Sequence, residues 1–352
     1  MPSNPLTTDL DHVLDHTRGL WEELRGEQIF ITGGTGFFGC WLLESLLWAN
    51  EKLNLNAHAA VLTRSPDSFK IKAPHLAGNE AVTLIKGDVR TFDFPTGTFH
   101  YVIHAATDSS TKPNGDDPLL MLDTIIEGTR HTLEFAKACG ARKFLLTSSG
   151  AVYGKQPPEL TQIPEEYSGA PDPMDTSFAY GQGKRVAEHL CSLYANQSNV
   201  EMSIARCFAF VGPYLPLDVH FAIGNFIHDA LNGESIVVKG DGTPYRSYLY
   251  AADLAIWLWT ILFKGQSCRP YNVGSDHELT IAELANTVAQ NFTPAPPVRI
   301  LKTANKSKPT ERYVPSTKRV SSELGLRLYI DLQTAIQKTI VWNSSIIEGE
   351  AK

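Results

Sequence analysis

The sequence of 352 residues has little of what marks secreted, membrane-spanning or nucleic-acid-binding chains. Its five cysteines are odd in number and form no Cys-x-x-Cys pair, so we expect reduced core residues and neither disulfides nor a metal site. The net charge is −7 without a lysine/arginine tract, which argues against general affinity for nucleic acid or an anionic membrane. No apolar run approaches the roughly 18–20 residues that span a bilayer, and the first residues show no apolar signal region. We therefore expect a soluble, cytoplasmic protein.

Short apolar segments alternate with helical periods after residue 26. We expect strands at 28–32, 58–62, 82–85, 101–104, 143–147 and 202–208, and helices at 38–48, 119–139 and 177–195. This alternation predicts an α/β fold, a Rossmann-like doubly wound parallel sheet with a smaller C-terminal substrate-binding lobe. Residues 1–26 would form an extension with one or two short helices, and 27–208 a dinucleotide-binding domain. Residues 209–352 would form mainly the lobe, with 250–275 returning to the first domain; a capping-box signature at Thr280 and Glu283 starts a helix there.

A glycine-rich turn joins the first expected strand to the first expected helix. Its sequence, Gly-Gly-Thr-Gly-Phe-Phe-Gly over 33–39, differs by one residue from the common Gly-x-Gly-x-x-Gly spacing. The first glycine permits a tight turn, the second lets backbone approach a pyrophosphate, and the third lets the helix pack close to the sheet. The free amides at the helix N-terminus favour phosphate as well. The residues predicted to bind a dinucleotide are Gly33, Thr35, Gly36, Phe37, Phe38 and Gly39.

The residues that follow the next three strands bear on which dinucleotide binds. NAD enzymes usually have an acid at the end of the second strand, whereas this chain has Arg64. A guanidinium suits a 2′-phosphate, so we favour NADP(H) over NAD(H), the alternative being a solvated arginine. Asp88, followed by Val89, would place a carboxylate on the adenine amine, unless Asp88 only caps a local turn. Ala105 and Ala106 are small enough to let backbone approach the cofactor.

Tyr180 and Lys184 lie four residues apart near the start of the third expected helix, so they share one face. The ammonium would lower the pKa of the phenol by stabilising the phenolate, and Tyr180 could then exchange a proton with a substrate hydroxyl. Lys184 could also bond the nicotinamide ribose. Ser149 ends the fifth strand at the edge where open sheets bind ligands, and could hold the same substrate oxygen. A lone Tyr-x-x-x-Lys pair is usually structural, but this order behind a glycine turn favours catalysis.

Several segments agree with one known family in order and spacing. They are the glycine turn, HAA at 104–106, TSSGAVYG at 147–154, the Tyr180/Lys184 pair, RCFAFVGP at 206–213, GDGTPYRSYLYAADLA at 240–255 and YNVG at 271–274. Together they resemble the extended short-chain dehydrogenase/reductases, and more narrowly the NAD-dependent epimerase/dehydratase family acting on nucleotide sugars. The resemblance covers about 27–292. It implies a nucleoside-diphosphate-sugar substrate and a homodimer formed through two helices, one of which carries Tyr180 and Lys184.

The resemblance also implies a set of site residues. Ser149, Tyr180 and Lys184 would be catalytic, and Arg246 would meet the substrate diphosphate unless it is a surface ion-pair residue. Further predicted cofactor contacts are Thr107, Thr147, Tyr180 and Lys184. The predicted substrate contacts are Thr107, Ser109, Ser149, Gly150, Tyr180, Asn225, Phe226 and Arg246. Other polar residues that could line the sugar pocket, with a surface or structural role as the alternative, are Asp108, Ser110 and His220.

Departures from the family pattern bear on the reaction. Dehydratases of the family carry an Asp-Glu pair just before Val-Tyr-Gly, and decarboxylases of nucleotide-activated glucuronate carry a Glu, whereas this chain has Gly150 and Ala151. Ile125 and Ala209 stand where the family often has asparagine, which suggests that the substrate binds in a different position from that of the common hexose substrates. We therefore predict a C4 epimerase that removes and returns a hydride through a 4-keto intermediate. The alternatives are an NADPH-dependent 4-keto-sugar reductase, a decarboxylase or dehydratase without the usual acids, and a non-catalytic dinucleotide-binding sensor or scaffold.

Overall fold

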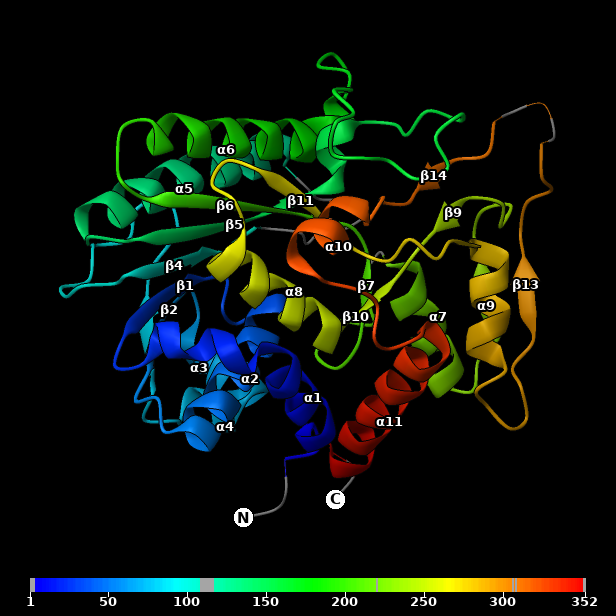
Figure 1. Ribbon diagram of the computed structural model, residues 1–352. Coiled ribbons are helices and arrows are strands. Elements are labelled where there is room, and N and C mark those ends of the chain that lie inside the picture. Colours follow the sequence, from blue (N-terminus) through cyan, green and yellow to red (C-terminus); the bar gives the residue numbers. More distant parts are fainter. Residues whose placement is uncertain (1–3, 108–116, 220, 306, 308, 351–352) are drawn as a thin grey trace.

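The computed structural model describes residues 4–107, 117–219, 221–305, 307 and 309–350. Within these residues the central layer is a seven-stranded sheet in the order β11-β6-β5-β4-β1-β2-β3, and every pairing is parallel (Figure 1). Its strands are β1 (Gln28–Thr32), β2 (His58–Thr63), β3 (Val82–Lys86), β4 (Tyr101–His104), β5 (Lys143–Ser149), β6 (Glu201–Cys207) and β11 (Pro270–Val273). The strand order reverses between β1 and β4, which confirms the Rossmann-like doubly wound sheet and places a ligand crevice at the carboxyl edge.

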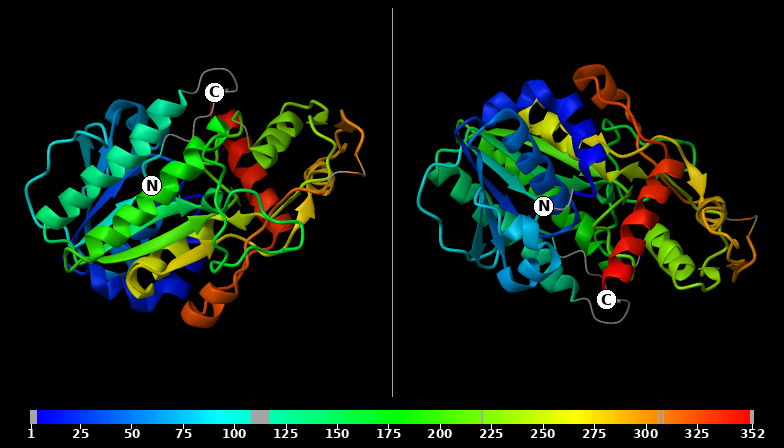
Figure 2. Two further views of the ribbon diagram at one scale, coloured as in Figure 1. Left: turned by 90° about the horizontal axis from the view of Figure 1, so that it is seen from above. Right: turned by 90° about the horizontal axis from the view of Figure 1, so that it is seen from below.

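Helices cover both faces of the sheet, as Figures 1 and 2 show. One face is covered by α5 (Pro118–Ala138) and α6 (Ala179–Ala195), which lie side by side. The other is covered by α2 (Phe37–Leu53) and α8 (Ala251–Lys264), with α1 (Thr7–Thr17) packed against both. Side chains of β1 alternate accordingly: Ile29 and Ile31 join the core under α2 and α8, and Phe30 joins the core under α5 and α6.

The expected elements agree with the structure, with differences at their ends. The largest is in α2, expected to end at residue 48, which continues to Leu53 and stops where Asn54 adopts a left-handed conformation (φ 50°). The helix expected from 177 begins at Ala179, because residues Thr176–Phe178 form a 3-10 turn capped by the Asp175 side chain. Two short helices, α3 (Pro66–Lys72) and α4 (Pro74–Ala77), follow β2 and were not predicted.

The N-terminal segment is packed into the molecule. Its helix α1 buries Leu10, Val13 and Leu14, and the 3-10 helix Arg18–Leu24 buries Trp21 and Leu24. The buried Asp9 carboxylate accepts hydrogen bonds from Tyr250 Oη at 2.7 Å and Lys338 Nζ at 2.8 Å. These bonds join α1 to Tyr250, which directly precedes α8, and to the C-terminal helix α11 (Leu332–Glu350), which lies beside α1 in Figure 1.

Small elements gather beyond the carboxyl edge of the sheet. The short strands form three groups: β7 (Phe210–Val211) with β10 (Leu249–Tyr250), β8 (Ile236–Val238) with β13 (Val298–Ile300), and β9 (Tyr245–Arg246) with β12 (Leu279–Thr280) and β14 (Arg312–Tyr313). The remaining helices are α7 (Ala222–Leu231), α9 (Ile281–Ala289) with the expected Thr280–Glu283 capping box, α10 (Lys318–Leu324), and the 3-10 turn Gly150–Tyr153. Although α8 and β11 follow residues 209–249 in the chain, they belong to the main sheet and its helical layer.

Two further properties bear on the expectations from composition. No helix in the described ranges has the length and apolar character that crossing a bilayer requires. The five cysteines are free thiols; Cys40, Cys191 and Cys207 are buried and Cys139 is half-buried, but Cys268 is exposed.

Candidate active site

A pocket of about 1050 Å³ follows the carboxyl edge of the sheet. The ends of β2 and β3 contribute Arg64 and Asp88, and the ends of β5 and β6 contribute Ser149 and Cys207. The pocket therefore crosses the point at which the strand order reverses, and it continues toward Arg246 in the small strands beyond the sheet.

The glycine turn lets neighbouring backbone segments approach closely. Gly33 has φ +71°, and a Cβ there would lie 2.5 Å from the carbonyl carbon of Ala105. A Cβ on Gly39 would lie 2.3 Å from Cα of Gly34, so the start of α2 packs against the turn as the pattern predicts. Gly39 stays outside the pocket lining for that reason. The predicted turn residues that line the pocket are Gly33, Thr35, Gly36, Phe37 and Phe38.

The carboxylate of Asp88 is held by its neighbour Arg90. It accepts from the Arg90 amide at 2.9 Å and from the Arg90 guanidinium at 2.9 and 3.0 Å. These bonds, with a smaller contribution from the charge of Arg64, lower the pKa of Asp88 to about 2. Asp88 thus caps a local turn and also lines the pocket, together with Val89, Ala105 and Ala106.

Lys72 is a pocket residue that the sequence analysis did not identify. Its Nζ donates to the backbone oxygen of Thr35 in the glycine turn at 3.0 Å. No sequence motif identifies Lys72 as a pocket residue, because the contact joins α3 to a turn 37 positions earlier in the chain.

The three predicted catalytic residues line the same pocket. Lys184 is 3% exposed, and its Nζ donates to Thr107 Oγ1 at 2.7 Å and to the backbone oxygen of Thr147 at 2.8 Å. The same Nζ lies 5.8 Å from the ring centroid of Tyr180. The nearby side chain of Ser149 lowers the pKa of Tyr180. The structure therefore brings together Ser149, Tyr180 and Lys184 with Thr107 and Thr147.

The electrostatics of this group differ from the expectation. Burial raises the pKa of Tyr180 to about 12, and the nearby Ser149 side chain only partly offsets this effect. Burial also lowers the pKa of Lys184 to about 8. Desolvation is therefore the dominant effect on both groups in the ligand-free site, and the phenol is neutral there.

The far end of the pocket carries Arg246. Its Nη1 donates to the backbone oxygen of Tyr245 at 2.8 Å, and Nη2 lies 3.9 Å from the exposed carboxylate of Glu311. Ala209, which replaces a family asparagine, also lines the pocket, whereas Ile125 is buried beside Gly183 of α6. The guanidinium is thus available on the pocket wall while it makes only a loose surface ion pair.

Some predicted site residues lie elsewhere. Phe226 is 3% exposed in the core, and neither it nor Asn225 lines the pocket; the preceding residues Phe221, Ala222 and Ile223 do. Gly150 lies just behind the lining. The predicted or considered residues outside the described part of the chain are Asp108, Ser109, Ser110 and His220.

Tyr313 is the site residue that the sequence analysis missed most clearly. Its hydroxyl lies 3.5 Å from Ser149 Oγ, although the two residues are 164 positions apart. It sits on the two-residue strand β14, which is too short to show a period in the sequence.

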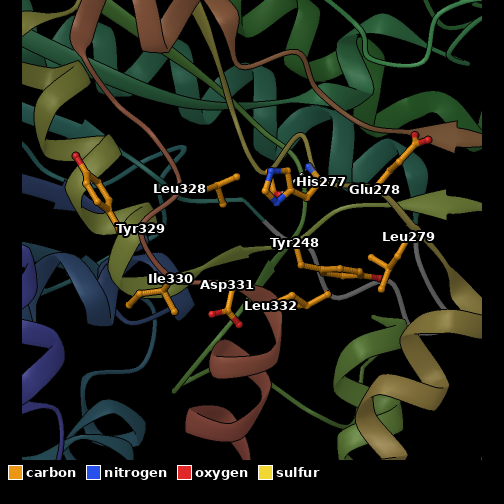
Figure 3. A pocket seen from close by; sticks show the side chains of 10 residues that line it. Tyr248, His277, Glu278, Leu279, Leu328, Tyr329, Ile330, Asp331 and Leu332 are labelled. Atoms are coloured by element: carbon orange, nitrogen blue, oxygen red, sulfur yellow. Dashed lines mark hydrogen bonds between the residues drawn. The ribbon is translucent and has the colours of Figure 1, made fainter.

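A second, smaller cavity of about 290 Å³ shares Tyr248 with the main pocket. Figure 3 shows the Tyr248 ring extending toward Leu279, with Leu332 below the ring and Leu328 beside His277. Two carboxylates line this smaller cavity. Glu278 forms an ion pair with Arg312, and Asp331 accepts hydrogen bonds from Thr334 at the start of α11, so both carboxylates already have partners.

The fold and the site together define an extended short-chain dehydrogenase/reductase, an enzyme class built on dinucleotide chemistry. The chain belongs to the NAD-dependent epimerase/dehydratase family, whose sequence model matches residues 29–274. This confirms the family resemblance, and with it the expectation of an NAD(P)-dependent enzyme.

Curated relatives and solved structures agree with this assignment. The chain is 34% identical to UDP-glucuronic acid decarboxylase 5 of Arabidopsis thaliana over 78% of this chain and 77% of that protein. It is 31% identical to UDP-glucuronic acid decarboxylase 1 of Xenopus tropicalis over 92% and 74%. Its fold is similar to that of a UDP-glucuronic acid 4-epimerase from Bacillus cereus in complex with UDP-glucuronic acid and NAD (TM-score 0.76, 21% identity, 91% and 99% covered). It is also similar to a UDP-N-acetylglucosamine 4-epimerase from Methanobrevibacter ruminantium (TM-score 0.77, 21% identity, 91% and 99% covered).

The expectation of NADP(H) is wrong. The family is NAD-dependent, and the Bacillus cereus structure holds NAD. The physical reason lies in the surroundings of Arg64, whose charge acts on the carboxylate of Asp88. A guanidinium at the end of β2 therefore does not by itself mark a 2′-phosphate site.

Proposed function

We propose that the protein is a nucleoside-diphosphate-sugar 4-epimerase that uses NAD. One observation carries the proposal: Ser149, Tyr180 and Lys184 line one pocket with the glycine turn, while Gly150 and Ala151 provide no acid for dehydration or for steering a carboxylate. Oxidation and re-reduction of one carbinol require only those three side chains and the cofactor. When bound, NAD accepts a hydride from the sugar carbon and returns it.

The chain's own residues handle the proton. Ser149 holds the oxygen of the reacting carbinol, and Tyr180 takes its proton as the carbonyl forms and gives it back on reduction. Lys184 is fixed by Thr107 and Thr147, which accept two of the three hydrogen bonds that its ammonium can donate. Tyr180 must be a phenolate to accept this proton, and the positive charge of Lys184 favours that form. Epimerisation follows when the keto-sugar presents its opposite face, and no net oxidation results.

The far end of the pocket supports a nucleoside diphosphate. Arg246 offers a planar set of N–H donors, which match a diphosphate oxygen pair. The family relatives named above act on UDP-linked sugars, so UDP-sugars are the first probes.

Decarboxylation of a nucleotide uronic acid is the second candidate. It is favoured by the curated relatives, which are UDP-glucuronic acid decarboxylases. Oxidation at C4 places a ketone β to the sugar carboxylate, which can then leave as carbon dioxide before the cofactor is re-oxidised. Ala151, in place of the glutamate of such enzymes, weighs against it. The keto-sugar reductase loses its basis with the correction from NADP(H) to NAD(H).

A homodimer formed through α5 and α6 completes the proposal. Both helices carry exposed apolar side chains, which are Leu119 and Leu120 on α5 and Val186 and Leu193 on α6. A Leu193→Arg variant should be monomeric in sedimentation analysis if this surface joins two copies. Unchanged sedimentation would place the contact elsewhere or exclude it.

Product analysis separates the two reactions. The protein is incubated with NAD and either UDP-glucose or UDP-glucuronic acid. The nucleotide sugars are then separated by chromatography, and their molecular masses are measured by mass spectrometry. An epimerase yields the C4 epimer with unchanged mass and without accumulation of reduced cofactor; a decarboxylase yields a UDP-pentose and carbon dioxide. Ser149→Ala is the control for background conversion. Conversion of neither sugar by NAD-loaded protein would contradict the proposal for this substrate class.

A further inference from the structure

We propose that Tyr214 is a positioning residue of the main pocket: held by Glu44 and His75, it fixes the pocket wall formed by Leu215 and Pro216, and the His75 charge makes this hold depend on pH. The two wall residues line the pocket, whereas the three residues that hold them do not. The inference deepens the proposed function and rests on it for the identity of the ligand. It concerns how firmly the pocket holds a nucleotide sugar, which the catalytic residues alone do not determine.

The wall begins in a strained turn. The amide of Leu215 donates to the backbone oxygen of Gly212 at 3.2 Å, and Tyr214 between them has φ +71°. Proline at the second position, here Pro213, and a positive φ at the third are features of a type II turn, which favours glycine at the third position. A tyrosine there is strained and persists only where its surroundings hold it. The contacts of Tyr214 therefore decide where the wall lies.

Two helices hold this turn. The Tyr214 hydroxyl donates to the Glu44 carboxylate of α2, and its ring packs on Trp342 of α11 with the ring centroids 5.0 Å apart. The backbone oxygen of Pro213 accepts a 2.9 Å hydrogen bond from Nε1 of Trp41, which also lies on α2. The wall is thereby tied to the helix that follows the glycine turn.

Glu44 is a buried carboxylate that the proposed mechanism does not use. Its side chain is 3% exposed, and besides the Tyr214 hydroxyl it accepts from Asn4 Nδ2 at 3.0 Å and from His75 Nε2 at 2.7 Å. A buried carboxylate is unfavourable unless it is hydrogen-bonded and paired with a cation. Of its three partners only His75, a half-exposed residue of α4, can carry a positive charge. The histidine therefore supports the acceptor that holds Tyr214.

The charge of His75 changes near neutral pH. The hydrogen bond to Glu44 raises the pKa of His75 above its ordinary value of 6.5. The cation is therefore fully present below that ordinary value and is lost as the pH rises through the raised one. Neutral donors then remain around the carboxylate, so the hold on the turn weakens as the pH rises.

The other charged groups around α4 have partners or stay neutral. This helix packs against α2, α3 and β3. Besides Glu44, the charged side chains of these elements are Glu51 and Lys52 on α2, Asp67, Lys70 and Lys72 on α3, and Lys86 on β3. The two acids in this group pair with neighbouring lysines at 3.5 and 3.0 Å, and Lys338 of α11 pairs with Asp9 at 2.8 Å. Burial raises the pKa values of Cys40 and Tyr214, on which the charge of Glu44 also acts, so both are neutral.

Tyr214→Phe and His75→Gln test this inference, each with a matched control. Tyr194→Phe also removes a hydroxyl bonded to a glutamate, but between α6 and α5, on the opposite face of the sheet from α2. His100→Gln also removes a histidine paired with a glutamate, but at the amino edge of the sheet, where β4 and β1 begin. Thermal unfolding checks that each variant is folded.

Two measurements are made, each at about pH 6 and about pH 9. Hydrogen exchange reports on the backbone amides of Gly212, Tyr214 and Leu215 in the ligand-free proteins. Calorimetry measures binding of UDP-glucose and UDP-glucuronic acid to the NAD-loaded proteins, with kcat and KM for whichever is converted. Lys184, whose pKa is about 8, is present in every variant, so its titration cancels when proteins are compared at one pH.

At about pH 6 we expect these amides to exchange faster in Tyr214→Phe and in His75→Gln than in wild type. Binding of the accepted UDP-sugar should weaken about three- to tenfold in Tyr214→Phe, the loss of one hydrogen bond, and about two- to fivefold in His75→Gln, the loss of one half-exposed ion pair. At about pH 9 His75→Gln should match wild type, which has then lost the cation too, while Tyr214→Phe should remain weaker. KM should follow binding, kcat should stay within about twofold because no catalytic side chain changes, and both controls should behave as wild type.

The outcomes separate the inference from the proposed function. If wild type binds a UDP-sugar and Tyr214→Phe matches Tyr194→Phe in exchange and in affinity, the inference is overturned and the function stands. A loss in His75→Gln that is equal at both pH values overturns the part assigned to the His75 charge, and a fall in kcat at constant KM overturns the assignment to binding. If wild type binds neither UDP-sugar, the proposed function falls, whereas faster exchange in Tyr214→Phe still supports the hold on the turn.

Discussion

Lys184 Nζ on α6 donates a 2.7 Å hydrogen bond to Thr107 Oγ1, which follows the end of β4. The ammonium is enclosed by this hydroxyl and a backbone carbonyl, and the nearby carboxylate of Glu188 bonds to Ser148 and Arg206. Lys184 is therefore a buried cation held by neutral oxygens. This arrangement fixes the orientation of the side chain but makes its charge unfavourable in the ligand-free protein.

The stability of the ligand-free protein should depend on Lys184 between pH 8 and 10.5. Its pKa is about 8 when folded and 10.5 ordinarily, so above pH 8 the unfolded chain binds the extra proton and stability rises with pH. Relative to Lys184→Met, the free energy of unfolding of wild type should rise by up to about 3 kcal/mol across this window. Urea unfolding at several pH values measures the difference. Parallel curves for the two proteins would show that the amine is not desolvated.

Tyr180→Phe should lower turnover by about two to four orders of magnitude, because the proton of the carbinol loses its acceptor. Binding of NAD should be nearly unchanged. The control is Tyr194→Phe on the same helix, whose hydroxyl bonds Glu134 and does not line the pocket. Unchanged turnover in Tyr180→Phe would remove this phenol from the mechanism.

The ion pair between Glu188 and Arg206 should be essential for stability. Both side chains are largely buried, at 12% and 14% exposure, and their closest atoms are 2.7 Å apart. Glu188→Ala leaves the buried guanidinium of Arg206 without its carboxylate partner and should lower the free energy of unfolding by about 3–5 kcal/mol. Glu201→Ala, which breaks the more exposed pair with Lys143, should cost at most about 1 kcal/mol. Comparable losses from the two substitutions would contradict the assignment.

Gly39→Ala should disrupt the turn that we assign to the cofactor. The new methyl group would overlap the backbone of Gly34, so we expect a loss of about 1–3 kcal/mol in stability and weaker NAD binding. Gly19→Ala has open space around it and serves as the control. Calorimetric titration with NAD and thermal unfolding measure both effects, and normal NAD affinity in Gly39→Ala would show that the turn tolerates the shift.

The parts of the fold that follow from local pattern could be predicted from the sequence. The strand at Gln28–Thr32 and the helix bearing Tyr180 were placed within two residues, because periodic burial and the glycine turn leave few alternatives. The same patterns led to the grouping of Ser149, Tyr180 and Lys184 at one sheet edge.

The parts that depend on long-range contacts could not be predicted. Tyr313 reaches Ser149 from a two-residue strand, and Lys72 reaches the glycine turn from a separate helix. The sequence prediction for the pKa of Tyr180 is wrong because burial raises that pKa, and a spacing rule does not measure burial. The choice of cofactor from Arg64 is wrong because an arginine at the end of β2 does not by itself mark a 2′-phosphate site; its charge also acts on Asp88, 24 positions away in the chain.

The position of β11 at the rim of the sheet limits how the enzyme can be divided or recombined. A fragment ending at residue 208 would lose β11 and α8. The backbone hydrogen-bonding groups of β6 at 204–207 would then be unpaired, and the apolar side chains that α8 covers would be exposed to solvent. Chimeras made to change the sugar preference should therefore take the whole segment from β1 to β11 from one parent. Only loops within this segment, or the residues that follow β11, should come from the other parent.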